Sequence, residues 1–367
     1  MLRDPNENLG ELRCSTGPEP PALAGPESLA DRGGVVRPTP NDSASEPDWR
    51  RALGDAVRDP FELCGLLDLP AELAEPAAAV NFPLLVPRGF IRRMQPGDPN
   101  DPLLLQVLPS PQELDEGNLP SDAVGDLQAN PQPGLLHKYQ GRALLILGGS
   151  CAVNCRYCFR RHFPYEESPR SEAGWAPALD YLQQEPSIHE VILSGGDPLI
   201  NGDTRLERLF NKLASIEHLQ TVRIHTRLPI VLPERVTVRL AQLLRDTRLN
   251  AVVVLHTNHA NEIDSHVVDA AKRLLSSGAL LFNQSVLLRG VNDSVQSLVD
   301  LSHKLIAIGV TPYYLHQIDR VPGSAHYETS SDHGVQLIGK MRKLLPGYAI
   351  PRFVQEVAGR PHKVVLA

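Results

Sequence analysis

The sequence has few aromatic residues, no strong excess of charge and no long apolar run. Phe, Trp and Tyr make up 5% of its 367 residues, and the formal net charge is −7. A mildly acidic chain without a block of lysine and arginine lacks the electrostatic footprint of a nucleic-acid-binding protein. The absence of 18 consecutive apolar residues excludes an ordinary membrane-spanning helix. We therefore expect a globular protein that binds neither nucleic acid nor membrane.

The amino-terminal segment lacks the apolar core of a secretory signal. Residues 1–45 are polar and rich in proline, glycine and acidic residues. They hold too few large apolar side chains to offset the entropy lost on ordering. This composition predicts a disordered tail and a cytoplasmic protein.

Three regions are predicted after the tail. Residues 46–135 show helical patterns broken by prolines, residues 136–345 alternate apolar runs with helical stripes, and residues 346–367 hold a last strand. The apolar runs lie at 143–147, 191–193, 221–225, 251–255, 280–287 and 311–315, followed by the strand at 352–357. One of the helical stripes consists of Leu206, Leu209, Phe210 and Leu213. Six such units, each roughly 30 residues long, predict an α/β fold in which buried parallel strands form a partial (β/α)6 barrel.

Unusual polar residues come directly after the predicted strands. Their positions are Cys151, Ser194–Asp197, His225–Arg227, His256 and Asp319. Barrel folds place their chemistry in the loops at the C-terminal ends of the strands. The sequence therefore predicts one functional site at this end of the barrel.

The five cysteines are unevenly distributed. Cys14 and Cys64 are isolated, whereas Cys151, Cys155 and Cys158 form a C-x3-C-x2-C run. Three thiolates on one loop can bind three irons of a [4Fe–4S] cluster and leave the fourth iron without a protein ligand. Zinc is the alternative, with His162 as a possible fourth ligand, but its sites normally contain paired C-x2-C elements. The spacing favours the cluster.

This loop resembles that of the radical S-adenosylmethionine (SAM) superfamily. The residue before the last cysteine, Tyr157, is aromatic, as is usual in that superfamily. One unit later, Ser194, Gly195, Gly196 and Asp197 resemble the motif that contacts the amino group of SAM. Glycines in such a motif allow close approach of the backbone. The resemblance implies a radical SAM barrel with SAM bound to the open iron.

Four segments narrow the resemblance to the lysine 2,3-aminomutase family. They are 151–161, 193–199, 283–293 and 312–319. The chain is most similar to the short branch that supplies (R)-β-lysine for modification of translation elongation factor P. The resemblance implies an isomerase that uses the cluster, SAM and pyridoxal 5′-phosphate to convert L-lysine to β-lysine. It also implies a reducing donor such as flavodoxin or ferredoxin, and a functional link to elongation factor P and its lysine ligase.

The same resemblance assigns roles to four charged residues. Lys363 corresponds to the lysine that forms a Schiff base with pyridoxal phosphate, a role that requires a neutral amine. Arg160 corresponds to the arginine that binds the substrate carboxylate, for which a guanidinium fork is suited. Asp319 and Glu356 correspond to the acidic pair that receives the distal ammonium of lysine. Glu356 departs from the aspartate usual at its position, so the pocket can differ in shape.

The remaining correspondences concern the cofactors. Lys138, Tyr139 and Arg142, placed just before the first strand, correspond to residues near pyridoxal phosphate, and His256 and Gln284 to contacts of SAM. Arg156 and Arg161 are expected to be structural or solvated.

The longer aminomutases carry cysteines for an intersubunit zinc site, and Ser294 stands where one of them would be. We therefore expect no structural zinc and a monomer or small homo-oligomer. Three alternatives remain: an aminomutase for another amino acid, a radical SAM enzyme without pyridoxal phosphate, and a non-enzymatic iron–sulfur electron carrier.

Overall fold

One sheet organises the structure, a computed structural model that describes residues 48–115, 118–169 and 171–367. The predicted disordered tail and Cys14 lie outside these residues. The nine strands of the sheet are ordered as in the sequence. They are β1 (Leu135–Tyr139), β2 (Arg142–Ile146), β3 (Glu190–Ser194), β4 (Thr221–Thr226), β5 (Asn250–His256), β6 (Leu280–Val286), β7 (Thr311–His316), β8 (Arg352–Gln355) and β9 (Val364–Val365).

The parallel part of the sheet confirms the predicted partial barrel. Strands β2 to β8 are parallel and correspond to the seven predicted strands, whereas β1 and β9 add antiparallel edges. The prediction missed both edge strands. Lys138 and Tyr139 therefore lie within β1 rather than before the first strand, and Arg142 opens β2.

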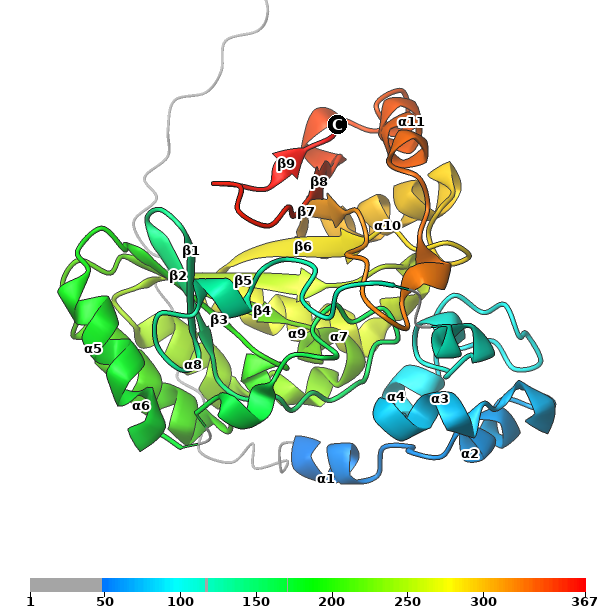
Figure 1. Ribbon diagram of the computed structural model, residues 1–367, viewed down its shortest axis with the longest axis horizontal. Helices are drawn as coiled ribbons and strands as arrows, with labels where there is room; N and C mark the ends of the chain where they lie inside the picture. The colour runs from blue at the N-terminus through cyan, green and yellow to red at the C-terminus, as the bar shows by residue number, and fades with distance from the viewer. Residues whose placement is uncertain (1–47, 116–117, 170) are drawn as a thin grey trace, which may run out of the picture. The chain divides into compact units, whose positions relative to one another are not determined.

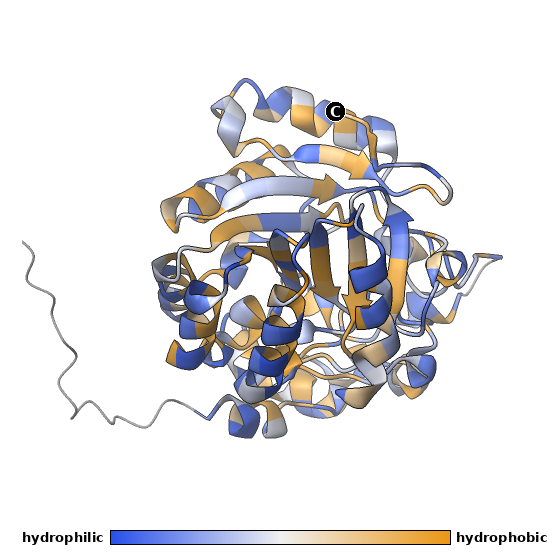
Figure 2. Ribbon diagram, turned by 90° about the vertical axis from the view of Figure 1, so that its left-hand side faces the viewer, coloured by the Kyte–Doolittle hydropathy of each residue, from blue (hydrophilic) through white to orange (hydrophobic). Residues whose placement is uncertain are grey.

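Helices follow the parallel strands and turn their apolar sides to the sheet (Figure 2). The predicted stripe is buried in α6, where Leu206, Leu209, Phe210 and Leu213 are all enclosed. Side chains cap several helices, and Ser294 caps α10 by accepting a hydrogen bond from the Ser297 amide. These helices are α5 (Ala176–Gln184), α6 (Asp203–Ala214), α7 (Leu228–Val231), α8 (Val238–Asp246), α9 (Ser265–Ser276), α10 (Val295–Ala307) and α11 (Ser331–Met341).

The region before the sheet is helical, as predicted, and most of it lies on the side to which the arrowheads of β5 and β6 point (Figure 1). Its helices are α1 (Trp49–Gly54), α2 (Pro60–Leu66), α3 (Pro76–Asn81) and α4 (Arg88–Ile91). Proline opens α2 and α3, where its missing N–H costs no helical hydrogen bond. Arg93 joins this region to the barrel by donating to the Ile230 carbonyl at 2.7 Å. No helix in the described ranges is long and apolar enough to cross a membrane.

Candidate active site

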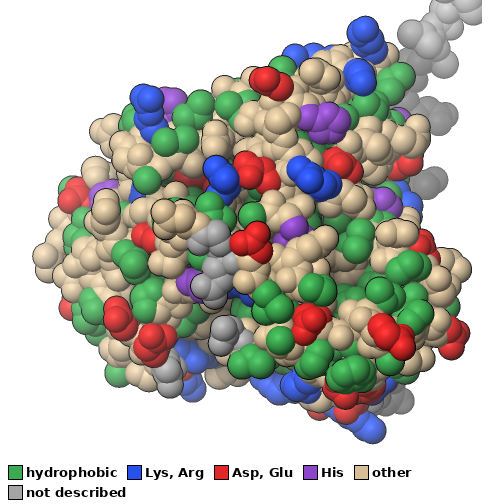
Figure 3. Space-filling model, turned by 45° about the vertical axis from the view of Figure 1, so that its right-hand side comes forward, with side chains coloured by type: hydrophobic (Ala, Val, Ile, Leu, Met, Phe, Trp, Pro, Cys, Tyr) green, Lys and Arg blue, Asp and Glu red, His purple; other side chains and the backbone are tan. Residues whose placement is uncertain are grey.

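A single cavity of about 940 Å³ collects all the predicted site residues. It is lined from β1 and from each of the parallel strands or the loops that follow them. Basic, acidic and histidine side chains gather across the middle of the face shown in Figure 3. The predicted residues at its wall are Lys138, Tyr139, Arg142, Cys151, Cys155, Cys158, Arg160, Ser194, Gly195, Gly196, Asp197, His256, Gln284, Asp319, Glu356 and Lys363. The structure brings these residues together around one cavity, whereas the role of each remains a prediction.

The loop after β2 presents three free cysteines to this cavity, Cys151, Cys155 and Cys158. Hydrogen bonding keeps the turn compact, since the Cys158 amide donates to the Cys155 carbonyl at 3.0 Å. Burial raises the pKa of the Cys158 thiol to about 11. Binding as a thiolate therefore requires a metal to replace the proton.

Gly195 and Gly196 bring the loop after β3 against this cysteine loop. A Cβ on Gly196 would lie 2.3 Å from the Ser150 carbonyl oxygen, and one on Gly195 would lie 2.4 Å from that of Gly148. The amide of Gly196 donates to the Gly148 carbonyl at 2.7 Å. From the sequence, these glycines were expected to let the backbone come close to a ligand. The structure shows that they are also required for the contact between the two loops.

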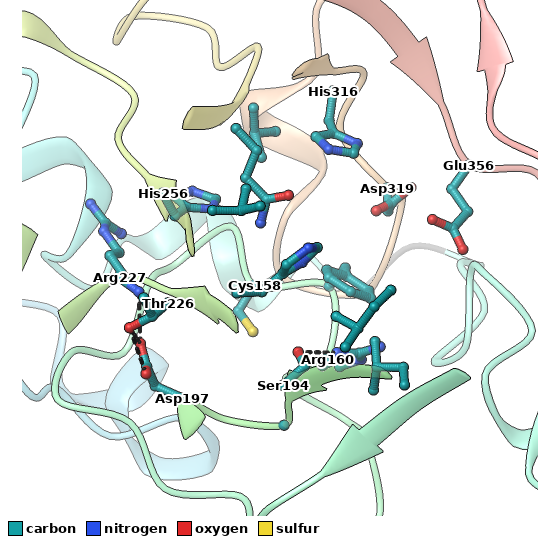
Figure 4. Close-up of a pocket in the computed structure, with 18 of the residues that line it drawn as sticks. Cys158, Arg160, Ser194, Asp197, Thr226, Arg227, His256, His316, Asp319 and Glu356 are labelled. Atoms are coloured by element: carbon teal, nitrogen blue, oxygen red, sulfur yellow. Dashed lines mark hydrogen bonds between the residues drawn. The ribbon is translucent and has the colours of Figure 1, made fainter. Parts of the chain in front are cut away.

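Asp197 directs its carboxylate into the protein. It accepts hydrogen bonds from the Thr226 hydroxyl at 2.8 Å and from the Arg227 amide at 2.7 Å, as Figure 4 shows. The amides of Leu199 and Leu228 also donate to it. Burial raises the pKa of Asp197 to about 6 despite these bonds. Asp197 therefore joins the loops after β3 and β4, and its carboxylate has little capacity left for a ligand.

Of the two alternatives expected for Arg156 and Arg161, structural or solvated, both residues show the structural one. Arg156 is fully buried, and its Nε donates to Glu113 at 2.8 Å. Arg161 donates to the same carboxylate at 3.0 Å. Glu113 belongs to the short helix Pro111–Leu114, so these bonds join the cysteine loop to the N-terminal region.

Arg160 lies at the cavity wall with a partner that the sequence did not reveal. Its Nε donates to Asp126 at 2.7 Å, and its Nη1 donates to the Ser194 hydroxyl at 3.2 Å. The other oxygen of Asp126 pairs with Lys138 at 2.5 Å. Although burial raises the pKa of Asp126, these two cations outweigh it and hold the pKa below its usual range. No sequence motif marks Asp126, which lies 34 residues before Arg160.

Glu356 pairs with two lysines, and one of them, Lys138, joins the C-terminal segment to β1. One oxygen pairs with Lys363, and the other accepts a hydrogen bond from Lys138 at 3.2 Å. Burial raises the pKa of Glu356, but the two ammonium groups outweigh burial and lower it to about 2. The predicted Schiff-base lysine is therefore held at the cavity wall by the second of the two predicted acids.

Asp319 differs from its neighbour. Burial, reinforced by the negative charge of Glu356, raises its pKa to about 7. Within the described part of the chain its carboxylate forms no salt bridge and no side-chain hydrogen bond. Figure 4 shows Asp319 and Glu356 across the cavity from Arg160. The cavity thus offers a cation at one side and an acid without a charged partner at the other.

Comparisons with known proteins agree with this geometry. Residues 145–301 match the model of the Radical SAM superfamily. The L-lysine 2,3-aminomutase of Escherichia coli K12 is 46% identical, with 88% of this chain and 95% of that protein covered. Its counterpart in Haemophilus influenzae is 45% identical over 88% of this chain and 96% of that protein. The L-lysine 2,3-aminomutase of Clostridium subterminale is 35% identical over 85% of this chain and 76% of that protein.

The chain belongs to the lysine 2,3-aminomutase family. It is therefore an enzyme of the radical SAM superfamily, and its class is that of the isomerases. A [4Fe–4S] cluster and SAM are the cofactors that membership of this superfamily implies.

The cysteines of this aminomutase fit such a cluster better than a single metal ion. In the described ranges no three histidine, cysteine or acidic side chains come together closely enough to hold one ion. A [4Fe–4S] cluster needs no such convergence, because each thiolate binds a different iron. His162, the alternative fourth zinc ligand, is outside the cavity wall and contacts the Pro322 carbonyl at 3.1 Å. Because the three cysteines would bind three of the four irons, the fourth iron would be open for SAM.

Proposed function

We propose that this enzyme converts L-lysine to β-lysine with the help of the cluster, SAM and pyridoxal phosphate. The observation that carries the proposal is the single cavity that joins the three cysteines, Lys363 and two opposite charges, Arg160 and Asp319. Family membership supports it, because the relatives named above are L-lysine 2,3-aminomutases. An electron carrier would require the cysteines but neither Lys363 nor these charges.

The two ends of lysine carry charges opposite to those of Arg160 and of ionised Asp319, which line the same cavity. The carboxylate and the distal ammonium of an extended lysine lie about 6 to 7 Å apart. Arg160 binds the carboxylate: a guanidinium has five N–H donors, and Asp126 and Ser194 take one each. Asp319 receives the ammonium, and binding of that cation favours its ionised form. A glutamate substrate would instead bring a second negative charge to Asp319 and would be repelled.

Lys363 is the residue that bonds covalently to pyridoxal phosphate in this proposal. The bound cofactor supplies an aldehyde for the amino group and a conjugated ring that withdraws electrons from the substrate. When the substrate amino group took the place of Lys363 on the cofactor, the Lys363 amine would be released beside Glu356, its present partner. Glu356 is proposed to join Asp319 around the substrate ammonium. Tyr139 and Arg142 lie at the same wall, where a ring and a cation suit a pyridine and a phosphate.

The cysteine side of the cavity serves SAM. The cluster and SAM, once bound, would supply a carbon radical for removal of hydrogen from the substrate, and a donor such as flavodoxin or ferredoxin would supply the electron. The residues around them position SAM and exclude water, and those at the wall include His256, Gln284 and the backbone of Ser194–Asp197. Orientation is the main contribution of the protein, because a near-attack geometry lowers the barrier of each transfer.

The product is proposed to be (R)-β-lysine, which a ligase attaches to elongation factor P in the cytoplasm. The chain resembles the short branch of the family in its motifs. It also spans 95% and 96% of the enterobacterial and Haemophilus relatives but 76% of the clostridial one.

An anaerobic reaction tests the proposal. The reconstituted protein is incubated with SAM, pyridoxal phosphate, L-lysine and a reductant, and the amino acids are separated on a chiral support. We expect (R)-β-lysine, and we expect absorbance near 420 nm from bound pyridoxal phosphate. Parallel reactions with glutamate and arginine serve as controls. Product from glutamate or arginine but not from lysine would contradict the assignment.

A further inference from the structure

A buried arginine touches one of the three cluster cysteines. Arg227 lies between β4 and α7, and its side chain is 7% exposed. Its Nη1 donates to the Sγ of Cys155 at 2.6 Å and to the Tyr157 hydroxyl at 2.6 Å. The sequence placed Arg227 among the polar residues after the predicted strands but assigned it no role, and the proposed reaction does not use it.

Three parts of the protein fix the position of the guanidinium. Its Nη2 donates to Gln106 from the N-terminal region at 2.8 Å and to Glu262 from the loop after β5 at 3.1 Å. Its guanidinium carbon lies 5.6 Å from the centre of the Phe90 ring and at the same distance from that of Tyr157. Tyr157 is held in turn by Asn258, which donates to its hydroxyl at 2.7 Å. The arginine therefore approaches Cys155 as part of a buried hydrogen-bond network.

A positively charged hydrogen-bond donor at a cluster thiolate stabilises the oxidised and the reduced cluster to different extents. Reduction adds an electron to the cluster, and hydrogen bonds to its sulfurs are among the factors that set its reduction potential. A positive charge stabilises the reduced form more than the oxidised form, so it makes the potential less negative. The carboxylate of Glu262, which is fully buried, opposes this effect with its own charge.

We propose that Arg227 is a positioning residue that raises the reduction potential of the cluster through Cys155, and that Glu262 limits this increase. The consequence is a cluster that its one-electron donor can reduce more easily before SAM is cleaved. The inference rests on the cluster that family membership implies, and it does not depend on lysine being the substrate.

A redox titration followed by electron paramagnetic resonance tests the inference without lysine or pyridoxal phosphate. In the reconstituted protein, Arg227→Gln should shift the midpoint potential to more negative values, whereas Arg227→Lys should restore part of the shift. Glu262→Gln should shift the potential in the opposite direction, because it removes the opposing charge. The matched control is Arg235→Gln: Arg235 is also fully buried and paired with an acid, Asp203, and its hydrogen bonds go to backbone carbonyls rather than to a cysteine.

Opposite shifts distinguish the proposed effect from general damage to the fold. An unchanged potential in Arg227→Gln, or shifts of the same sign in Arg227→Gln and Glu262→Gln, would overturn the inference. If Arg227→Gln binds no iron, Glu262→Gln decides alone, and anything but a less negative potential contradicts the proposal. Because no substrate is present, failure here leaves the proposed lysine reaction untouched.

Discussion

Two neighbouring carboxylates, Asp319 and Glu356, are held in different charge states by their surroundings. Glu356 lies between two lysines and has a pKa of about 2, whereas Asp319 has no such partner and a pKa of about 7. Separation of the pKa values of two adjacent acids is a common feature of catalytic sites. Asp319 is therefore the acid whose charge responds to what enters the cavity.

The pH dependence of lysine turnover should report this acid. Below its pKa Asp319 is neutral and cannot pair with the ammonium of lysine, so kcat/KM should rise as the pH increases through about 7. Glu356→Gln should move this ionisation to lower pH, because Glu356 raises the pKa of Asp319. The ionisation should be lost in Asp319→Asn. Its persistence in that variant would assign it to another group.

The contribution of Asp319 to lysine turnover can be measured separately from its pKa. Loss of one partner of a buried ion pair costs roughly 3–5 kcal/mol. Asp319→Asn should therefore reduce lysine turnover by about two to four orders of magnitude. Iron content and bound pyridoxal phosphate should be unchanged. Asp246→Asn, at an exposed position on α8, is the matched control and should retain activity. Normal turnover in Asp319→Asn would place this acid outside the substrate site.

Residues in short local motifs could be identified from the sequence, whereas their long-range partners could not. The cysteine spacing indicates a cluster by itself, and Arg160 is placed by its distance from Cys158. Asp126 and Arg227 contact residues 34 and 72 positions away. No local motif marks Asp126, and the position of Arg227 after a predicted strand does not reveal its contact with Cys155. Only the fold brings these groups together.

At the scale of the elements, apolar parallel strands were predictable and the two edge strands were not. Strands β2, β3 and β5 are largely apolar, and β4 and β8 keep two buried apolar residues each, because the helices and the barrel interior enclose these positions. β1 includes His137, Lys138 and Tyr139 and faces the cavity, so its pattern resembles a loop. β9 is only two residues long and depends on pairing with β8. Both unpredicted strands lie at the edges of the site and carry or flank residues proposed to bind pyridoxal phosphate.

Because the loops after β2 and β3 are in close contact, adding a single methyl group at Gly196 should disturb the cysteine loop. Gly196→Ala would place a Cβ 2.3 Å from a backbone oxygen of the cysteine loop, which must then shift. Iron content per chain and SAM cleavage should both fall. Gly339→Ala, where no atom lies within 4 Å of the added Cβ, is the control and should be neutral. Full iron loading in Gly196→Ala would show that the two loops can separate without consequence.

At the scale of the molecule, the helical N-terminal region takes part in the site rather than only preceding the barrel. Glu113 binds two arginines of the cysteine loop, and Gln106 binds Arg227. Their burial makes these contacts costly to break, because the arginines would be left without a counter-charge. The stability of the cysteine loop thus depends on residues that precede the sheet.

Unfolding measurements can compare this buried contact with an exposed one. Glu113→Gln should lower the free energy of unfolding by about 3–5 kcal/mol, since two buried arginines lose their acid. Glu62→Gln removes an exposed pair with Arg88 and should change it by no more than about 1 kcal/mol. Denaturant titrations of the apoprotein give both values. Equal effects of the two substitutions would contradict a structural role for Glu113.

The fate of the amino group of lysine tests the central claim most directly. The reconstituted enzyme is incubated anaerobically with SAM, pyridoxal phosphate, a reductant and L-lysine that carries nitrogen-15 only at its α-amino group. The account predicts β-lysine with the label on carbon 3, and no product from Lys363→Ala with its cluster intact. Lysine recovered unchanged by the wild-type enzyme, despite a reduced cluster and cleavage of SAM, would contradict it. So would β-lysine that has lost the label.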